Sequence, residues 1–265
     1  MSDDLSPILN RWKFDPNTFM VRIVRGDEGR DKIQLRVDLG ILQMEMDGRP
    51  DGRRPEGFES WLECYERRQE EHDETDPVSE PFMLGEEDCF RLWGEAMQYY
   101  HRYLSLWHLE RYDLCARDTA RNLRLFAFVR TYAQDDRHKR QFDQWRPYVL
   151  MMHARAVAVP LFHQSLFEDG LRAIDAGIDG IREFLDEYDQ SDRAEECLEL
   201  MSLERWREET LLKEERAAAA RPQTAAELLR GQLEKAVAAE EFEEAARLRD
   251  RIRQLSDEAR NLSGE

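Results

Sequence analysis

The spacing of apolar residues after Pro55 constrains the fold more than any other feature of the sequence. Apolar side chains recur there at i, i+3, i+4 and i+7, first at Phe58, Trp61, Leu62 and Tyr65. This is the period of an α-helix with one buried face. It predicts helices over residues 58–76, 86–109, 111–133, 147–163 and 167–188, followed by a charged, exposed helical connector over residues 191–220. The apolar anchors expected in this connector are Leu198, Met201, Leu203 and Trp206.

The segment before Pro55 has a different pattern. Residues 19–25 and 32–39 alternate between apolar and polar side chains, with a Gly-Asp-Glu-Gly turn between them, which predicts a β-hairpin. The positions expected to face inward on the second strand are Ile33, Leu35, Val37 and Leu39. Residues 41–46 are expected to prolong that strand beyond a bulge at Gly40. Because an isolated hairpin is only marginally stable in water, it is expected to pack on the helices that follow.

Two of the predicted helices begin with related sequences. Residues 112–117 (Tyr-Asp-Leu-Cys-Ala-Arg) align with residues 167–172 (Phe-Glu-Asp-Gly-Leu-Arg) at an offset of 55 residues. Each copy has an aromatic residue first and a small residue, Cys115 or Gly170, three positions later, where a neighbouring helix can approach closely. Helical-hairpin repeats are built in this way. The pattern resembles tetratricopeptide (TPR) repeats, although the offset is longer than the TPR period. The alternative is that two helices of similar composition align by chance.

The C-terminal residues predict a second kind of helical hairpin. Thr224 and Glu227 fit the S/T-x-x-E capping box that begins a helix. Apolar residues follow on one face at Leu229, Leu233 and Val237, and a second helix opens at Phe242 with a heptad-like stripe at Ala245, Leu248, Ile252 and Leu255. Two helices joined by a tight turn are expected. Phe242 is expected to fill the corner between them, so that its truncation to alanine would cost about 3 kcal/mol. The residues expected to surround its ring are Leu233, Val237 and Ala246.

Residues 242–250 (Phe-Glu-Glu-Ala-Ala-Arg-Leu-Arg-Asp) carry the most specific resemblance in the chain. They follow the aromatic-Glu-x-Ala-Ala-x-x-Arg-Asp pattern of the UVR (UvrB/UvrC) motif, and the resemblance covers about 32 residues. This motif occurs at the ends of excinuclease subunits B and C, in the arginine-kinase activator McsA and in some Clp ATPases. The resemblance implies a protein–protein interaction hairpin. The residues expected to contact a partner are Leu229, Leu233, Val237, Phe242, Ala245, Arg249, Ile252 and Leu255.

The charge of the chain argues against a nucleic-acid partner. Acidic residues outnumber basic ones by 57 to 39, which gives a formal net charge of −18. A field of this sign repels nucleic-acid phosphate. Basic residues nevertheless gather on the last helix, at Arg247, Arg249, Arg251 and Arg253. They either pair with nearby acids, as Glu243 with Arg247, or orient an acidic partner hairpin.

No motif in the sequence carries catalytic chemistry. The sequence has no G-x-x-x-x-G-K-[ST] loop, no C-x-x-C pair and no H-x-x-x-H or H-E-x-x-H motif. His101 and His108 are expected to pack among aromatic residues, and the cysteines to be buried thiols at Cys64, Cys89, Cys115 and Cys197. A signal peptide and an apolar run of ~18–20 residues are both missing. We therefore expect a cytoplasmic protein that is no enzyme and needs no cofactor or metal.

Two regions have alternative interpretations. An aromatic cluster is either core or, together with Arg117, Arg121 and Arg124, the lining of a peptide-binding surface; its members are Trp93, Tyr99, Tyr100, Tyr103 and Trp107. Residues 48–53 (Gly-Arg-Pro-Asp-Gly-Arg) form either a plain surface loop or a functional loop.

The expected organisation has four parts: a β-hairpin segment over 1–57, a TPR-like helical domain over 58–190, a charged helical linker over 191–221 and a UVR hairpin over 222–258. The expected function is that of a non-enzymatic adaptor, which docks a protein partner or a second copy of itself through the hairpin and the helical surface. The alternative is an accessory factor of DNA excision repair that contacts nucleic acid or the excinuclease complex.

Overall fold

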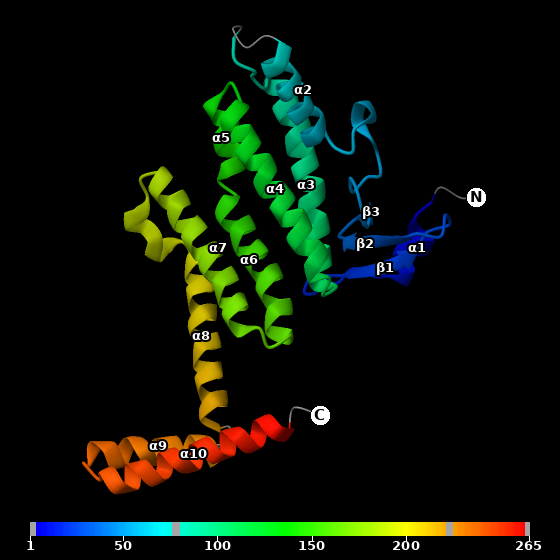
Figure 1. The fold of residues 1–265 in the computed structure, drawn as a ribbon. Coiled ribbons are helices and arrows are strands. Elements are labelled where there is room, and N and C mark those ends of the chain that lie inside the picture. Colours follow the sequence, from blue (N-terminus) through cyan, green and yellow to red (C-terminus); the bar gives the residue numbers. More distant parts are fainter. Residues whose placement is uncertain (1–3, 76–79, 221–224, 263–265) are drawn as a thin grey trace. The chain divides into compact units, whose positions relative to one another are not determined.

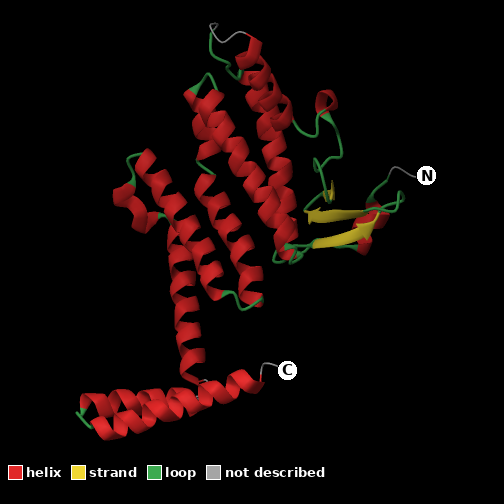
Figure 2. Ribbon diagram, in the orientation of Figure 1, coloured by secondary structure: helices red, strands yellow, loops and turns green. Residues whose placement is uncertain are grey.

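The computed structural model describes residues 4–75, 80–220 and 225–262 (Figure 1). The chain divides into two compact units, residues 1–207 and 208–265. Helices make up most of both units, and strands occur near the N-terminus (Figure 2). The predicted mainly α-helical class is therefore confirmed.

A short helix and a small sheet open the first unit: α1 (Ser6–Arg11), β1 (Val21–Arg25), β2 (Asp31–Val37) and β3 (Gly40–Glu45). The sheet is antiparallel in the order β1-β2-β3, so the predicted hairpin is confirmed. The predicted bulge at Gly40 is wrong, because Gly40 pairs with Val37 and the chain reverses between them. A two-residue connection between paired positions is a hairpin turn, and Asp38 followed by Leu39 supplies it. Leu39 consequently lies 89% exposed at the turn and does not face inward.

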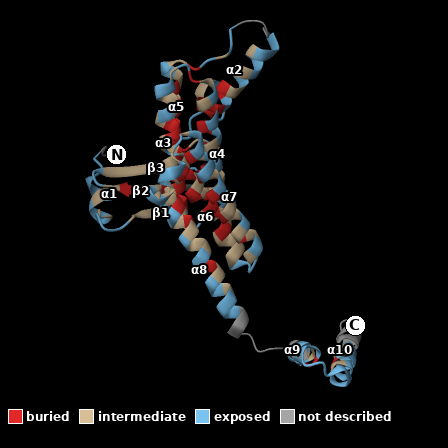
Figure 3. Cartoon of the chain, turned by 90° about the vertical axis from the view of Figure 1, so that its left-hand side faces the viewer, coloured by how far each residue is buried: buried red, intermediate tan, exposed pale blue. Residues whose placement is uncertain are grey.

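One face of the sheet is buried against the helices. Ile33 and Leu35 on β2 and Met44 on β3 are buried in the same apolar cluster as Tyr103 and Ile174 of the helices. Ile33 and Met44 are paired across the two strands, which places both side chains on one face. The sheet therefore has the support that the sequence predicted it would need, and Figure 3 shows the buried residues of the unit in red.

The helices of the first unit are α2 (Trp61–Thr75), α3 (Glu86–His108), α4 (Tyr112–Tyr132), α5 (Asp136–Asp143), α6 (Arg146–His163) and α7 (Phe167–Glu187), with 3₁₀ turns at Pro55–Gly57 and Ser191–Glu196. All five predicted helices are present. Helix α5 was not predicted, because Phe142 is its single large apolar residue and one residue shows no period. Its start did have a sequence signal: Asp135 caps the helix by accepting a 2.8 Å hydrogen bond from the Arg137 amide.

The hairpins α3–α4 and α6–α7 share one corner geometry. The central residue of each three-residue loop is left-handed, with φ of 56° at Glu110 and 61° at Ser165. The next amide donates a 2.9 Å hydrogen bond to the carbonyl five residues earlier, from Arg111 to Leu106 and from Leu166 to Leu161. This pattern closes the end of a helix and turns the chain back.

Aromatic side chains at equivalent positions pack against each other at both corners. The ring centroids of Trp107 and Tyr112 lie 5.1 Å apart, and those of Phe162 and Phe167 lie 5.9 Å apart. The small residues of the alignment, Cys115 and Gly170, are buried. The alignment at an offset of 55 residues therefore corresponds to two hairpins with the same corner. The resemblance to TPR repeats stays a prediction.

Helix α8 (Leu198–Ala220) begins in the first unit and ends in the second. Its first turns are not the exposed connector that the sequence predicted, because Leu200 and Leu203 are buried in the core. Leu203 was a predicted anchor, and that prediction is confirmed. The predicted anchors Leu198 and Met201 are instead 74% and 44% exposed. Leu200 was not predicted as an anchor, because only a few apolar residues at helical spacing mark this face among many charged ones.

The second unit holds the end of α8 and a hairpin of α9 (Ala225–Ala238) and α10 (Phe242–Leu262), which pack side by side. Glu240 in the loop is left-handed with φ of 57°. The Glu241 amide donates a 2.9 Å hydrogen bond to the carbonyl of Ala236, again five residues earlier. This is the corner geometry of the two hairpins in the first unit, and the predicted C-terminal hairpin is confirmed.

Candidate functional site

The seam between α9 and α10 is narrow. Ala236 and Leu248 are its buried residues in the described part of the hairpin, at 6% and 9% exposure. Four of the predicted contact residues are half-buried beside them: Leu229, Leu233, Ala245 and Ile252. These positions recur at alternating steps of three and four residues, which is the spacing of a two-helix seam. Much of the apolar surface that was predicted to contact a partner is therefore in the interface between α9 and α10.

Phe242 does not fill the corner, and the predicted role of Phe242 as the centre of the hairpin core is wrong. Its side chain is 70% exposed, and Val237 beside the turn is 53% exposed. The reason is the helical step of about 100° per residue, which places Phe242 roughly 120° around α10 from Leu248. Two large apolar side chains are thus exposed at one end of the hairpin.

Two predicted features of the hairpin lie outside the described residues. They are the capping box at Thr224 and the side chain of Leu255.

The arginines of α10 face solvent. Arg247 pairs with Glu244 at 3.6 Å, and not with Glu243 as predicted, while Arg249 lies 3.8 Å from Asp250. Ion pairs this long between exposed side chains contribute little to stability. The guanidinium groups can therefore turn to a partner at small cost.

The predicted aromatic cluster of α3 divides between two faces. Tyr99 is buried, with the guanidinium groups of Arg102 and Arg121 at 4.8 Å and 4.0 Å from its ring centroid. Arg117 pairs with Asp47 and Asp118, and Arg124 pairs with Glu66. The three predicted arginines are thus engaged in ion pairs on the side of Tyr99. On the other side, Trp93, Tyr100 and Tyr103 line a separate cavity.

A buried ionic network lies beside Tyr99. Glu95 is fully buried and accepts hydrogen bonds from the amides of Trp61 and Leu62, at 2.8 Å and 3.1 Å, and from Arg49 and Arg121. It therefore holds the start of α2 and the loop around Arg49 against α3. Sequence reasoning missed this residue, because one carboxylate among 57 acidic residues has no distinguishing pattern.

A second buried pair completes the network. Arg102 donates to both carboxylate oxygens of Asp118, at 2.6 Å and 2.9 Å, and to the carbonyl of Gly48 at 2.8 Å. The 48–53 loop is therefore fixed at Gly48 and Arg49. These hydrogen bonds and ion pairs are sufficient to explain the conformation of the loop.

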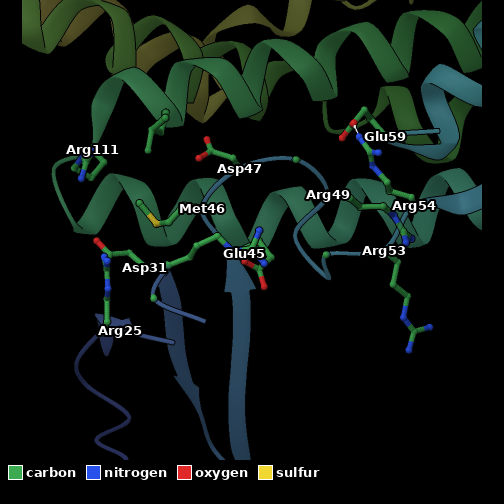
Figure 4. A pocket seen from close by; sticks show the side chains of 15 residues that line it. Arg25, Asp31, Glu45, Met46, Asp47, Arg49, Arg53, Arg54, Glu59 and Arg111 are labelled. Atoms are coloured by element: carbon green, nitrogen blue, oxygen red, sulfur yellow. Dashed lines mark hydrogen bonds and ion pairs between the residues drawn. The ribbon is translucent and has the colours of Figure 1, made fainter. Parts of the chain in front are cut away.

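The same loop borders a cavity of about 820 Å³ at the ends of the strands (Figure 4). Arginines surround it, but Arg25 pairs with Asp31 at 2.9 Å and Arg54 pairs with Glu59. Arg53 extends away from Arg49 in Figure 4. Two of the cavity's arginines are thus paired within the lining, and Arg49 is held by Asp51 and Glu95.

The histidines and cysteines are further side chains that could bind a metal ion or act as nucleophiles. No group of three or more His, Cys, Asp or Glu side chains among them is placed to hold a metal ion. Burial raises the pKa of Cys89 to about 11 and that of Cys115 to about 12, so both thiols stay protonated and unreactive near neutral pH. His108 stacks on Phe19 at 4.0 Å between ring centroids, in agreement with its predicted aromatic packing. None of the described helices is both long and apolar enough to span a membrane.

Comparison with known families identifies the hairpin. Residues 225–258 match the UVR family, described as the UvrB/uvrC motif, and this range spans α9 and most of α10. The resemblance predicted from residues 242–250 is therefore confirmed for the hairpin. Comparisons with curated proteins and with solved structures give no match.

Proposed function

We propose that this protein is a cytoplasmic, non-enzymatic adaptor that docks a protein partner through its UVR hairpin. The observation that carries the proposal is the exposure of Val237 and Phe242 at the corner of the hairpin. Exposed aromatic residues are common in the centres of protein interfaces. In this proposal the helical array of the first unit is a second docking surface of the adaptor.

The corners of the α3–α4 and α6–α7 hairpins support this interpretation. Val237 and Phe242 occupy the positions of Trp107 and Tyr112 in the first hairpin, five residues apart around the same turn. There the corner is covered, because the ring of His163 lies 6.3 Å from that of Tyr112. In the next hairpin, Trp206 lies 5.6 Å from Phe162. A docked partner would give the third corner the same cover.

The proposal predicts that Phe242→Ala abolishes partner capture. The full-length protein would be used as bait in a cell extract, and captured proteins quantified by mass spectrometry. We expect a specific partner to be lost by at least about tenfold, as for truncation of an aromatic residue at an interface centre. Phe90→Ala is the matched control, since Phe90 on α3 is 76% exposed. Equal capture by Phe242→Ala and wild type would place the docking surface elsewhere.

Charge reversal at Arg249 tests the basic side of α10. Arg249→Glu should leave the helical content unchanged, because its one ion pair is exposed and long. If the arginines orient an acidic partner, association should weaken several-fold, mainly through a slower association rate, and should become less sensitive to salt. Surface plasmon resonance with the captured partner would measure both rates. Unchanged rates would assign these arginines to pairing within the helix.

A second candidate function is that of an accessory factor in DNA excision repair, favoured by the match to the UvrB/uvrC motif. DNA binding distinguishes this repair function from the adaptor function. A contact with phosphates would give an affinity that falls steeply as salt rises. The adaptor, with its net charge of −18, should show no such binding in a filter assay.

A further inference from the structure

A second cavity belongs to the first unit and not to the hairpin, and residues of α3, α4 and α6 line most of it. Its volume is about 150 Å³, and its walls are Trp93, Ala96, Met97, Tyr100, Tyr103, Asn122, Phe126, Trp145, Tyr148 and Val149. None of these side chains carries a charge. An ion buried here would have no counter-charge in the wall, which is costly, so the cavity favours a neutral occupant.

The size of the cavity limits the occupant to one ring. An apolar cavity of about 150 Å³ holds a single benzene-sized molecule. The walls already contain aromatic pairs, with Tyr100 perpendicular to Tyr103 at 5.6 Å between centroids and tilted against Tyr148 at 6.5 Å. An added aromatic ring would extend this arrangement at favourable distances and angles.

The hydroxyl groups in the wall indicate a polar group on that ring. Tyr100, Tyr103 and Tyr148 line the cavity, and their hydroxyls form no hydrogen bond within the described part of the chain. These hydroxyls are not among the buried polar atoms that lack a partner, so they stay accessible to a polar group in the cavity. Burial raises the pKa of Tyr148 to about 12, so this hydroxyl stays protonated near neutral pH and can donate.

The cavity is partly open to solvent. Trp145, between α5 and α6, is 49% exposed and forms part of its wall. Rotation of an exposed side chain is a small movement compared with separation of the helices. The cavity can therefore exchange its contents without unfolding.

We infer that this cavity is a binding site for a neutral ligand with one aromatic ring and a polar group on its edge, such as a phenol. The site is independent of the hairpin. Its ligand is either a free small molecule or the side chain of a tyrosine in a peptide.

Isothermal titration of the full-length protein with p-cresol tests the inference. We expect saturable binding of one molecule per chain, and none of benzoate, which has the same size but a negative charge. Tyr103→Phe should weaken the binding of p-cresol at least about fivefold and leave the binding of toluene unchanged, because the substitution removes only a hydroxyl. Tyr132→Phe is the matched control, since Tyr132 does not line the cavity.

Each result decides a part of the inference. Absence of saturable p-cresol binding would overturn it, as would equal binding of benzoate. Binding of p-cresol that is the same in Tyr103→Phe and wild type, with unfolding curves showing both proteins folded, would place the ligand elsewhere and also overturn it. N-acetyltyrosinamide separates the two sources: if it binds as well as p-cresol, the ligand is a peptide side chain, and if p-cresol alone binds, it is a free molecule.

Discussion

Replacing Glu95 with alanine is expected to lower the free energy of unfolding by about 3–5 kcal/mol, the usual cost of removing one partner from a buried ion pair. The carboxylate is fully buried and bonds to Arg49, Arg121 and two amides at the start of α2. Without it, two guanidinium groups and two amides would lose their acceptor in an environment of low polarity. Urea unfolding followed by circular dichroism would measure the loss.

An exposed ion pair serves as the control for Glu95. Glu204 pairs with Arg182 at 2.7 Å, and both side chains are largely exposed. Glu204→Ala should cost no more than about 1 kcal/mol, because solvent screens such a pair. Equal losses for Glu95→Ala and Glu204→Ala would contradict the role assigned to the buried network.

Replacing Gly170 with leucine should destabilise the first unit by about 3 kcal/mol, at the upper end of the usual range for overpacking. Gly170 lies near the start of α7 with no room for a side chain. A Cβ built on it would lie 2.7 Å from Cδ1 of Phe162, whose own ring is held between Phe167 and Trp206. Relief of the overlap would require the corner of the α6–α7 hairpin to open.

Gly94→Leu is the control for this substitution. Gly94 is also helical, but a Cβ built on it meets nothing within 4 Å. Leucine there should leave stability unchanged or raise it by up to about 1 kcal/mol, through its better helix propensity. A melting temperature for Gly170→Leu equal to that of Gly94→Leu would mean that the close packing at the corner is not rigid, and the shared corner would lose its structural importance.

The sequence predicted the helices well, because apolar periodicity persists over several turns in each of them. The prediction from sequence failed where the apolar pattern covers only a few residues. Helix α5 has one large apolar residue, Phe142, and β3 was attached to β2 because the turn at Asp38 contains a leucine in place of a typical turn residue. Both errors concern segments of six to eight residues.

The candidate site was only partly predictable. Residues 242–250 predicted the hairpin correctly, since a motif fixes its own local fold. The side-chain roles within it depend on which helical face meets the other helix, and this placed Leu248 inside and Phe242 outside. The Glu95 network joins residues that are far apart in sequence, so no local pattern could indicate it.

Hydrogen–deuterium exchange of the full-length protein, alone and with the captured partner, tests the docking role of the hairpin most directly. The protection that a partner adds reports where it lies on the chain. We predict that the added protection falls on peptides that cover residues 232–248, around Val237 and Phe242, and that Phe242→Ala removes it. Protection confined to α3–α7, with none on α9 and α10, would contradict the account.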